Sequence, residues 1–174
     1  MRLAGAGLAA EVPAGWDARI YTRPLAAPAV LPAPRVSPFE RQARAAGGTA
    51  SLHAASFPLP ADDGDFGTEA TSTMPAGGAF LALLEYEVGG GLEPGVGLFA
   101  ARGLPGALRR GDFAPEAMLR PRPGRGGVQR FFTVAGRPFC LYAVIGRAAE
   151  STGALGELNG LLGSLRFSRG LTGR

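Results

Sequence analysis

Two adjoining apolar runs near the carboxyl end limit the possible folds more than any other feature of this chain. Residues 129–134 (QRFFTV) and 139–145 (FCLYAVI) are rich in aromatic and β-branched side chains, and the segment AGRP separates them. This arrangement predicts a β-hairpin. The second run is apolar at consecutive positions, so both of its faces must be covered. We therefore expect an antiparallel sheet with this strand at its centre and further structure on both sides.

Further strands are expected along the rest of the chain. The run 80–88 alternates strongly, and it places Glu85 and Glu87 on the same face. An opening hairpin is expected from residues 6–12 and 16–22, which flank a Pro-Ala-Gly turn and bring Trp16 onto the core. The remaining strands are expected at 51–59, 95–101 and 165–167.

Helical signals are short and few. Thr68 is a candidate N-cap for a helix that Pro75 ends, and residues 115–119 predict one helical turn. Ser151 or Thr152 is expected to cap the last helix. The buried face of that helix is a stripe of four leucines, Leu155, Leu158, Leu162 and Leu165, and its glycines, Gly156 and Gly160, form a small surface that would let it approach the sheet closely.

Together these elements predict a single α+β domain over residues 1–174. Its core is a largely antiparallel sheet, with a C-terminal helix and one or two short helices packed on it. A chain of 174 residues with 46% hydrophobic side chains has enough apolar material for such a core. Residues 24–48 contain five prolines and are expected to form an extended loop outside the core. The tail from residue 168 is expected to fray.

Three segments of this pattern resemble the PsbP-like fold family: the opening AAEVPAGWDARIY, the hairpin RFFTVAGRPFCLYAVIG and the terminal LNGLLGSLRF. The resemblance covers most of the chain except 24–48, and it rests on the order of elements, not on a specific motif. It implies a PsbP-like sandwich. Members of that family are mainly binding, assembly or chaperone-like proteins without a shared catalytic site, so the resemblance implies no functional residues.

The side-chain inventory excludes several kinds of chemistry. All 18 basic residues are Arg, Lys is absent, and His53 and Cys140 are the only residues of their types. A chain without Lys has no Schiff-base lysine and no Walker-type phosphate loop, and one His with one Cys makes no zinc or iron–sulfur centre. We therefore predict no cofactor and no metal.

The compartment is predicted from what the sequence lacks. The apolar start at residues 3–10 is short and interrupted by glycines, which is a poor signal peptide and a better first strand. No run approaches the roughly 20 apolar residues of a membrane span. A single Cys agrees with a reducing compartment. These features predict a cytoplasmic protein.

An arginine-rich stretch between residues 102 and 130 is the leading candidate for a binding site. Its six proposed contact residues are Arg102, Arg109, Arg110, Arg120, Arg122 and Arg125. The guanidinium groups suit carboxylates or phosphates. Phe131 and Phe132 could stack on bases, but no recognised RNA-binding signature is present, so an acidic protein surface is favoured over nucleic acid.

Three other groupings have structural interpretations that we favour. Asp62, Asp63, Asp65 and Glu69 could hold Ca²⁺, but their spacing does not match an EF-hand, and an acidic turn before a helix explains them. Glu85 and Glu87 could form a glycosidase pair, but cross-strand ion pairing with Arg130 or Arg137 is the better interpretation. Cys140 with His53 could form a nucleophilic dyad. Cys140 lies in the most apolar strand, where it is expected to be inert, and His53 is expected to be half-buried and hydrogen-bonded.

The favoured function is a non-catalytic protein-binding, adaptor or chaperone-like domain with an acidic partner. The first alternative is a small-ligand-binding domain with a pocket between sheet and helix. The second is a carboxylate-dependent hydrolase that would use Glu85. Homo-oligomerisation is left open.

Overall fold

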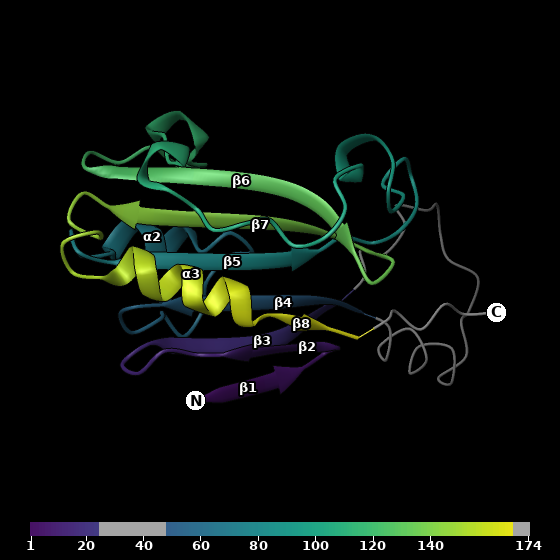
Figure 1. Cartoon of the computed structure of the whole chain (residues 1–174), viewed down its shortest axis with the longest axis horizontal. Coiled ribbons are helices and arrows are strands. Elements are labelled where there is room, and N and C mark those ends of the chain that lie inside the picture. Colours follow the sequence, from purple (N-terminus) through teal and green to yellow (C-terminus); the bar gives the residue numbers. More distant parts are fainter. Residues whose placement is uncertain (25–47, 169–174) are drawn as a thin grey trace, which may run out of the picture.

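The computed structural model describes residues 1–24 and 48–168, and it has an α+β fold with two antiparallel sheets (Figure 1). The larger sheet has five strands in the spatial order β3 (Asp17–Pro24), β4 (Gly48–Ala55), β5 (Ala79–Glu85), β7 (Arg137–Gly146) and β6 (Arg125–Val134). The smaller sheet has three strands in the order β1 (Arg2–Gly5), β2 (Leu8–Glu11) and β8 (Arg166–Phe167). This confirms the predicted α+β class with antiparallel sheet pairing and few helices.

The β6–β7 hairpin forms as expected. Its two-residue turn, Ala135-Gly136, has positive φ angles of 53° and 75°, the combination that matches the twist of paired strands. All ten residues of β7 are buried, and β5 and β6 flank the strand. The strand therefore needs no polar face, which explains why its sequence is apolar at consecutive positions.

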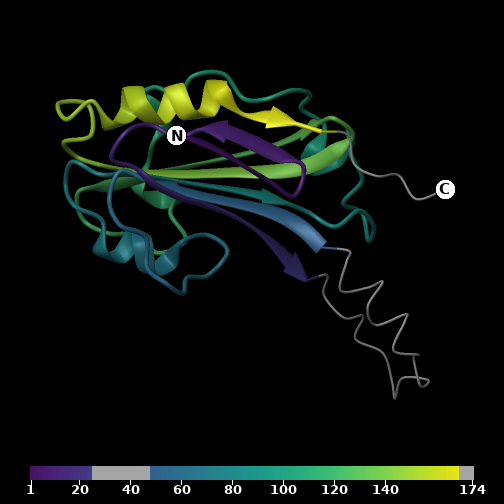
Figure 2. The same ribbon diagram turned by 90° about the horizontal axis from the view of Figure 1, so that it is seen from below.

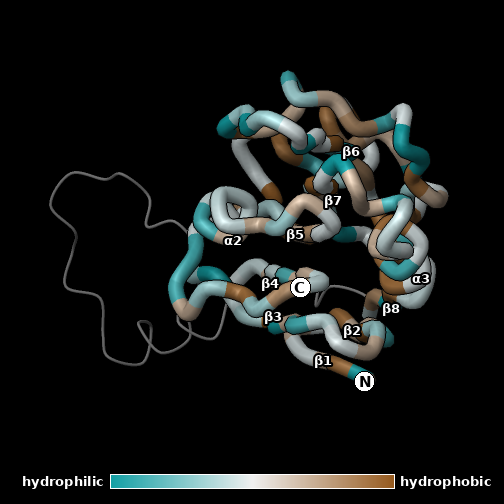
Figure 3. The backbone as a smooth tube through the Cα atoms, turned by 90° about the vertical axis from the view of Figure 1, so that its left-hand side faces the viewer, coloured by the Kyte–Doolittle hydropathy of each residue, from teal (hydrophilic) through white to brown (hydrophobic). Residues whose placement is uncertain are grey.

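Two apolar clusters cover the two faces of the large sheet (Figures 2 and 3). On one face, α3 (Ala154–Ser164) and the small sheet pack on alternate residues of β5 and β7 such as Leu81 and Leu141. On the other face, α2 (Thr68–Thr73) and its flanking loops cover Phe80, Tyr142 and Val144. The four leucines of the α3 stripe are all buried, as predicted. Gly156 and Gly160 instead face open space, so the predicted close approach through these glycines is wrong.

The predicted opening hairpin is also wrong. Residues 6–12 and 16–22 do not pair, because β2 pairs with β1 and β8 while β3 pairs with β4 in the other sheet. The actual turn is Ala6-Gly7, where Ala6 has φ 48°, a conformation that alanine seldom adopts and that the sequence therefore does not signal. The Pro-Ala-Gly segment carries the chain between the sheets. Trp16 is buried after it, and its indole Nε1 donates to Glu157 of α3 at 2.8 Å.

Several elements begin, end or form differently from the predictions, mainly where glycines adopt positive φ. The strand expected at 95–101 is a loop with a 3₁₀ turn, η1 (Gly97–Phe99), because Gly95 and Gly97 adopt positive φ. Strand β4 ends at Ala55, earlier than expected. Neither α2 nor α3 has the predicted Thr or Ser cap, since a left-handed glycine precedes each helix. The turns η2 (Arg110–Asp112) and η3 (Pro115–Ala117) lie in the arginine-rich stretch, η3 where a helical turn was predicted.

Two predictions concern residues that lie wholly or mostly outside the described ranges. Most of the proline-rich segment 24–48 lies outside the described residues, and only its ends are seen, where Pro24 pairs with Gly48. The tail beyond Ser168 also lies outside them. Among the helices of the described ranges, none is long and apolar enough to cross a bilayer.

Candidate functional site

Most of the arginine-rich stretch lies at one end of the large sheet, where β6 begins and β7 finishes. Arg125 is the register partner of Gly146, and the amide of Arg147 donates to the Gly124 carbonyl at 2.9 Å. The amide of Arg125 donates to the Arg122 carbonyl at 3.2 Å, and Arg110 reaches the Gly146 carbonyl at 3.4 Å. We name this group the arginine end, and it consists of Arg110, Arg120, Arg122, Arg125 and Arg147.

One of the predicted contact residues, Arg102, lies apart from that end. Arg102 bridges to Thr133, eight positions beyond Arg125 on β6, which is about 26 Å along an extended strand. Arg109 adjoins Arg110, and it follows Leu108, whose backbone is hydrogen-bonded to the side chain of Asn159 in α3. The six predicted arginines therefore do not form one patch.

Arg125 has a structural role within the arginine end. Its half-buried guanidinium donates to the carbonyls of Thr71, Ser72 and Met74, where α2 ends and its last carbonyls lack helical partners. Partial burial lowers the pKa of Arg125, and the positive charge of Arg122 lowers it further. Two guanidinium groups are thus held near each other at this end.

The residues of the arginine end form no ion pair within the described part of the chain. Three ion pairs occur within residues 1–24 and 48–168: Arg23–Asp65, Arg130–Asp112 and Arg137–Glu85. None of them involves a residue of the arginine end. Leu119 lies beside these arginines, and 54% of its surface is exposed although its amide is held by the Tyr142 hydroxyl. The surface therefore combines cations with an exposed aliphatic side chain.

Glu85 has a structural role inside the fold. Its two oxygens accept from Nε and Nη2 of Arg137 at 2.7 and 2.6 Å, and one also accepts from the Ala50 amide at 2.8 Å. Both carboxylate oxygens are therefore occupied, which leaves Glu85 poorly suited to general acid–base work. Glu87 lies beyond the last residue of β5, so the prediction that the two glutamates share a strand face is wrong.

Cys140 and His53 are both buried and are not hydrogen-bonded to each other in the described chain. Burial raises the pKa of the Cys140 thiol to about 12, so the thiolate nucleophile is scarce near neutral pH. Nε2 of His53 lies 3.0 Å from the Tyr21 hydroxyl and 2.7 Å from the Asp65 carbonyl. A carbonyl only accepts, so Nε2 carries the proton. His53 is hydrogen-bonded as predicted but fully, not half, buried.

The acidic turn supports the helix that follows it. The two oxygens of Asp63 accept from the amides of Glu69 and Ala70, both at 2.9 Å, and Asp65 pairs with Arg23 at 2.7 Å. Asp63 is therefore the side-chain cap that Thr68 was predicted to be. No group of three or more potential metal-ligating side chains lies together within the described residues.

Sequence reasoning did not identify Arg147 as part of the site. The signal that could have found it is the hairpin register. A two-residue turn at Ala135-Gly136 pairs Val134 with Arg137, and counting outward brings Arg125 opposite Gly146, next to Arg147.

No family model, curated protein or solved structure matches the chain. The resemblance to the PsbP-like family therefore stays at the level of the sequence pattern. The functional interpretation depends on the residues themselves.

Proposed function

We propose that this chain is a non-catalytic protein-binding domain that contacts an acidic partner through the arginine end. The observation that carries the proposal is the gathering at this end of Arg110, Arg120, Arg122 and Arg147, which form no ion pair within the described residues, with Leu119 exposed next to Arg120. Guanidinium groups bind carboxylates in bidentate geometry, and Arg is enriched at protein interfaces. An exposed aliphatic side chain next to them adds apolar contact to such a surface.

The support beneath these arginines is rigid. Arg125 ties the start of β6 to the end of α2, and the backbone of Arg147 is bonded to Gly124 across the hairpin. A preformed surface loses less conformational entropy on binding. The resemblance to a family of mainly binding and assembly proteins agrees with the proposal.

Nucleic acid is disfavoured because the aromatic side chains of the stretch are engaged elsewhere. Phe132 is buried and stacks on Phe139 at a centroid distance of 6.0 Å. Phe131 packs edge-on against Phe99 at 5.8 Å. Neither ring is presented beside the arginines as a base-stacking platform.

The alternative pocket between sheet and helix has less support. Leu158, Leu161 and Leu162 of α3 are 0–1% exposed and belong to the same apolar cluster as the sheet residues beneath them. These side chains fill the space that such a pocket would need.

The test compares two variants with equal loss of charge. One changes Arg120, Arg122 and Arg147 to Gln, and its matched control changes the exposed Arg2, Arg102 and Arg166, which lie outside the arginine end. Binding of a short Glu-rich peptide containing Leu, and of a single-stranded oligonucleotide of equal charge, is measured by fluorescence anisotropy at several salt concentrations. We expect the first variant to lose most of its affinity for the peptide and the control to lose little. Equal losses, or tighter binding of the oligonucleotide by the unmodified protein, would contradict the proposal.

A further inference from the structure

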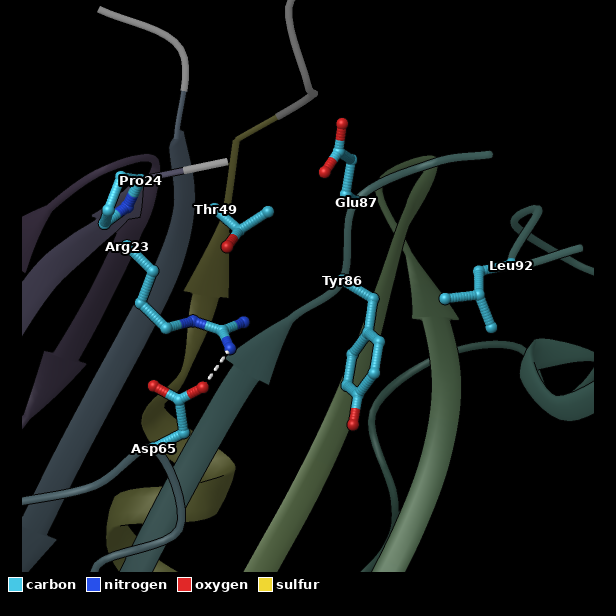
Figure 4. Close-up of a pocket in the computed structure, with 7 residues that line it drawn as sticks. All are labelled: Arg23, Pro24, Thr49, Asp65, Tyr86, Glu87 and Leu92. Atoms are coloured by element: carbon cyan, nitrogen blue, oxygen red, sulfur yellow. Dashed lines mark hydrogen bonds and ion pairs between the residues drawn. The ribbon is translucent and has the colours of Figure 1, made fainter. Parts of the chain in front are cut away.

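A groove opens at the end of the large sheet opposite the arginine end. Its volume is about 440 Å³, within the range of small-molecule sites, and seven residues from both sides of the sheet end line it: Arg23, Pro24, Thr49, Asp65, Tyr86, Glu87 and Leu92. Figure 4 shows Arg23 and Asp65 on one side and Tyr86 and Leu92 on the other. The groove is separate from the residues of the proposed protein contact.

The aromatic wall of the groove is fixed in place by the sheet. The amide of Tyr86 donates to the Pro138 carbonyl at 2.9 Å, which extends the β5–β7 pairing past the last residue of β5. The Tyr86 ring packs against Phe99 at a centroid distance of 5.3 Å. Three successive glycines, Gly89 to Gly91, adopt positive φ before Leu92, whose amide donates to Gly89. Tyr86 is therefore held by the sheet and by Phe99, and the turn at Gly89 to Gly91 carries Leu92 to the same side of the groove.

The charges that line the groove are unequal. Among the lining residues that the structure describes, Arg23 is the single cation, and it is already paired with Asp65 at 2.7 Å and donates to the Glu85 carbonyl. Glu87 is exposed and forms no ion pair with any residue of the described chain. The side chain of Asp65 is 49% exposed despite its partner. With two carboxylates against one engaged guanidinium, the groove favours a cation and repels an anion.

We propose that this groove binds a small organic cation, a primary amine or guanidinium with a short aliphatic chain. The cationic group lies against the Glu87 carboxylate, within reach of the electron-rich face of Tyr86. The aliphatic part lies along Leu92. The same chemistry is offered by a free amine and by a Lys or Arg side chain of another protein.

The test uses n-butylamine and butyrate as probes, because the two have the same chain and opposite charge. Each is titrated into the full-length protein at constant ionic strength while backbone amide shifts are followed by NMR. We expect butylammonium to produce saturable shifts around Tyr86 and residues 89–92, and butyrate to produce none there. Blocked lysine, N-acetyl-lysine-methylamide, serves as a second cation. If it binds more tightly than butylamine, the occupant is a side chain of another protein. If the two bind equally, the groove recognises only the cationic group and its aliphatic chain, as in a free amine.

A matched pair of variants tests whether Glu87 is the carboxylate that binds the cation. Glu87→Gln should weaken butylammonium binding about fivefold, the effect of one exposed ion pair. Glu93→Gln removes the same charge from an exposed position in the same loop that does not line the groove, and it should change binding little. Equal effects of the two variants, equal shifts with butyrate, or shifts that never saturate would overturn the proposal.

Discussion

At the scale of single residues, Arg137 makes the most internal polar contacts. It pairs with Glu85 through two hydrogen bonds, and its guanidinium also donates to the carbonyls of Ala6, Gly7 and Ser168. These acceptors belong to the small sheet and the residues beside it, whereas Glu85 belongs to the large sheet. One buried side chain therefore connects the two sheets.

Replacing Arg137 by Gln should destabilise the protein by about 3–5 kcal/mol, because it leaves the carboxylate of Glu85 buried without a cation. Urea denaturation followed by tryptophan fluorescence measures this loss. The control is Arg130→Gln, since the Arg130–Asp112 pair is much more exposed, with 45% and 35% of its two side chains accessible, and should contribute less than about 1 kcal/mol. Equal losses in the two variants would show that Arg137 is not the connection we describe.

His53 gives the stability a dependence on pH. Burial lowers its pKa from the ordinary 6.5, and Nδ1, where a second proton would bind, has no hydrogen-bond partner within the described residues. Arg19, Tyr21, Asp63 and Asp65 are the charged or titratable groups that surround it. The unfolded chain therefore binds this proton at a higher pH than the folded chain does.

The stabilisation from neutral His53 should be complete above pH 6.5 and should be lost as the pH falls through the lower pKa of the folded state. The free energy of unfolding, measured by urea titration from neutral pH down to about pH 5, should decline in the unmodified protein. The decline should be smaller in His53→Gln, which cannot gain the charge. An identical slope in both proteins would assign the effect to other groups.

At the scale of elements, the short helix α2 depends on a side chain outside it. Both oxygens of Asp63 accept from its first-turn amides, which otherwise have no partners. Asp63→Ala should therefore cost about 1–2 kcal/mol, at the upper range for helix caps. Thr68→Ala should cost much less, since Thr68 makes no side-chain cap bond. Thermal denaturation of the two variants provides the comparison, and a larger loss from Thr68→Ala would show that the cap is misassigned.

The elements that the sequence predicts well are those decided locally. The β6–β7 hairpin, the core of β5 and the leucine stripe of α3 follow from patterns within about ten residues. The pairing of β2 with β8 could not be predicted in this way, because β8 is at the far end of the chain. The cap of α2 was missed because Asp63 lies outside the usual capping position. Pairings over long distances depend on the packing of whole layers.

The candidate site could be predicted only in part, because it also depends on pairings between segments that are distant in the sequence. Arg110, Arg120, Arg122 and Arg125 are close in sequence and lie at one end of the sheet. Arg102 is near them in sequence, but the loop around η1 carries it to the other end of β6. Arg147 joins the site through the register of a hairpin, and Arg125 is turned inward to α2. The sequence therefore predicted that arginines form the site, but the strand pairing of the sheet determines which of these arginines lie together.

At the scale of the whole molecule, the arginine end and the groove lie at opposite ends of the large sheet. The arginine end lies where β6 starts and β7 finishes, and the groove with Glu87 lies past the end of β5, which runs antiparallel to β7. The two proposals together would give the domain two independent contacts, one for an acidic partner and one for a small cation. The arginine end is the one that carries the proposed function.

The most direct test of that function maps where an acidic ligand lies. Amide hydrogen exchange is measured by mass spectrometry on the protein alone and on the protein saturated with the Glu-rich peptide. We predict slower exchange in residues 119–125 and 146–150, with no change in residues 89–98. Protection confined to residues 89–98, or no protection at the arginine end while the peptide is bound, would contradict the account.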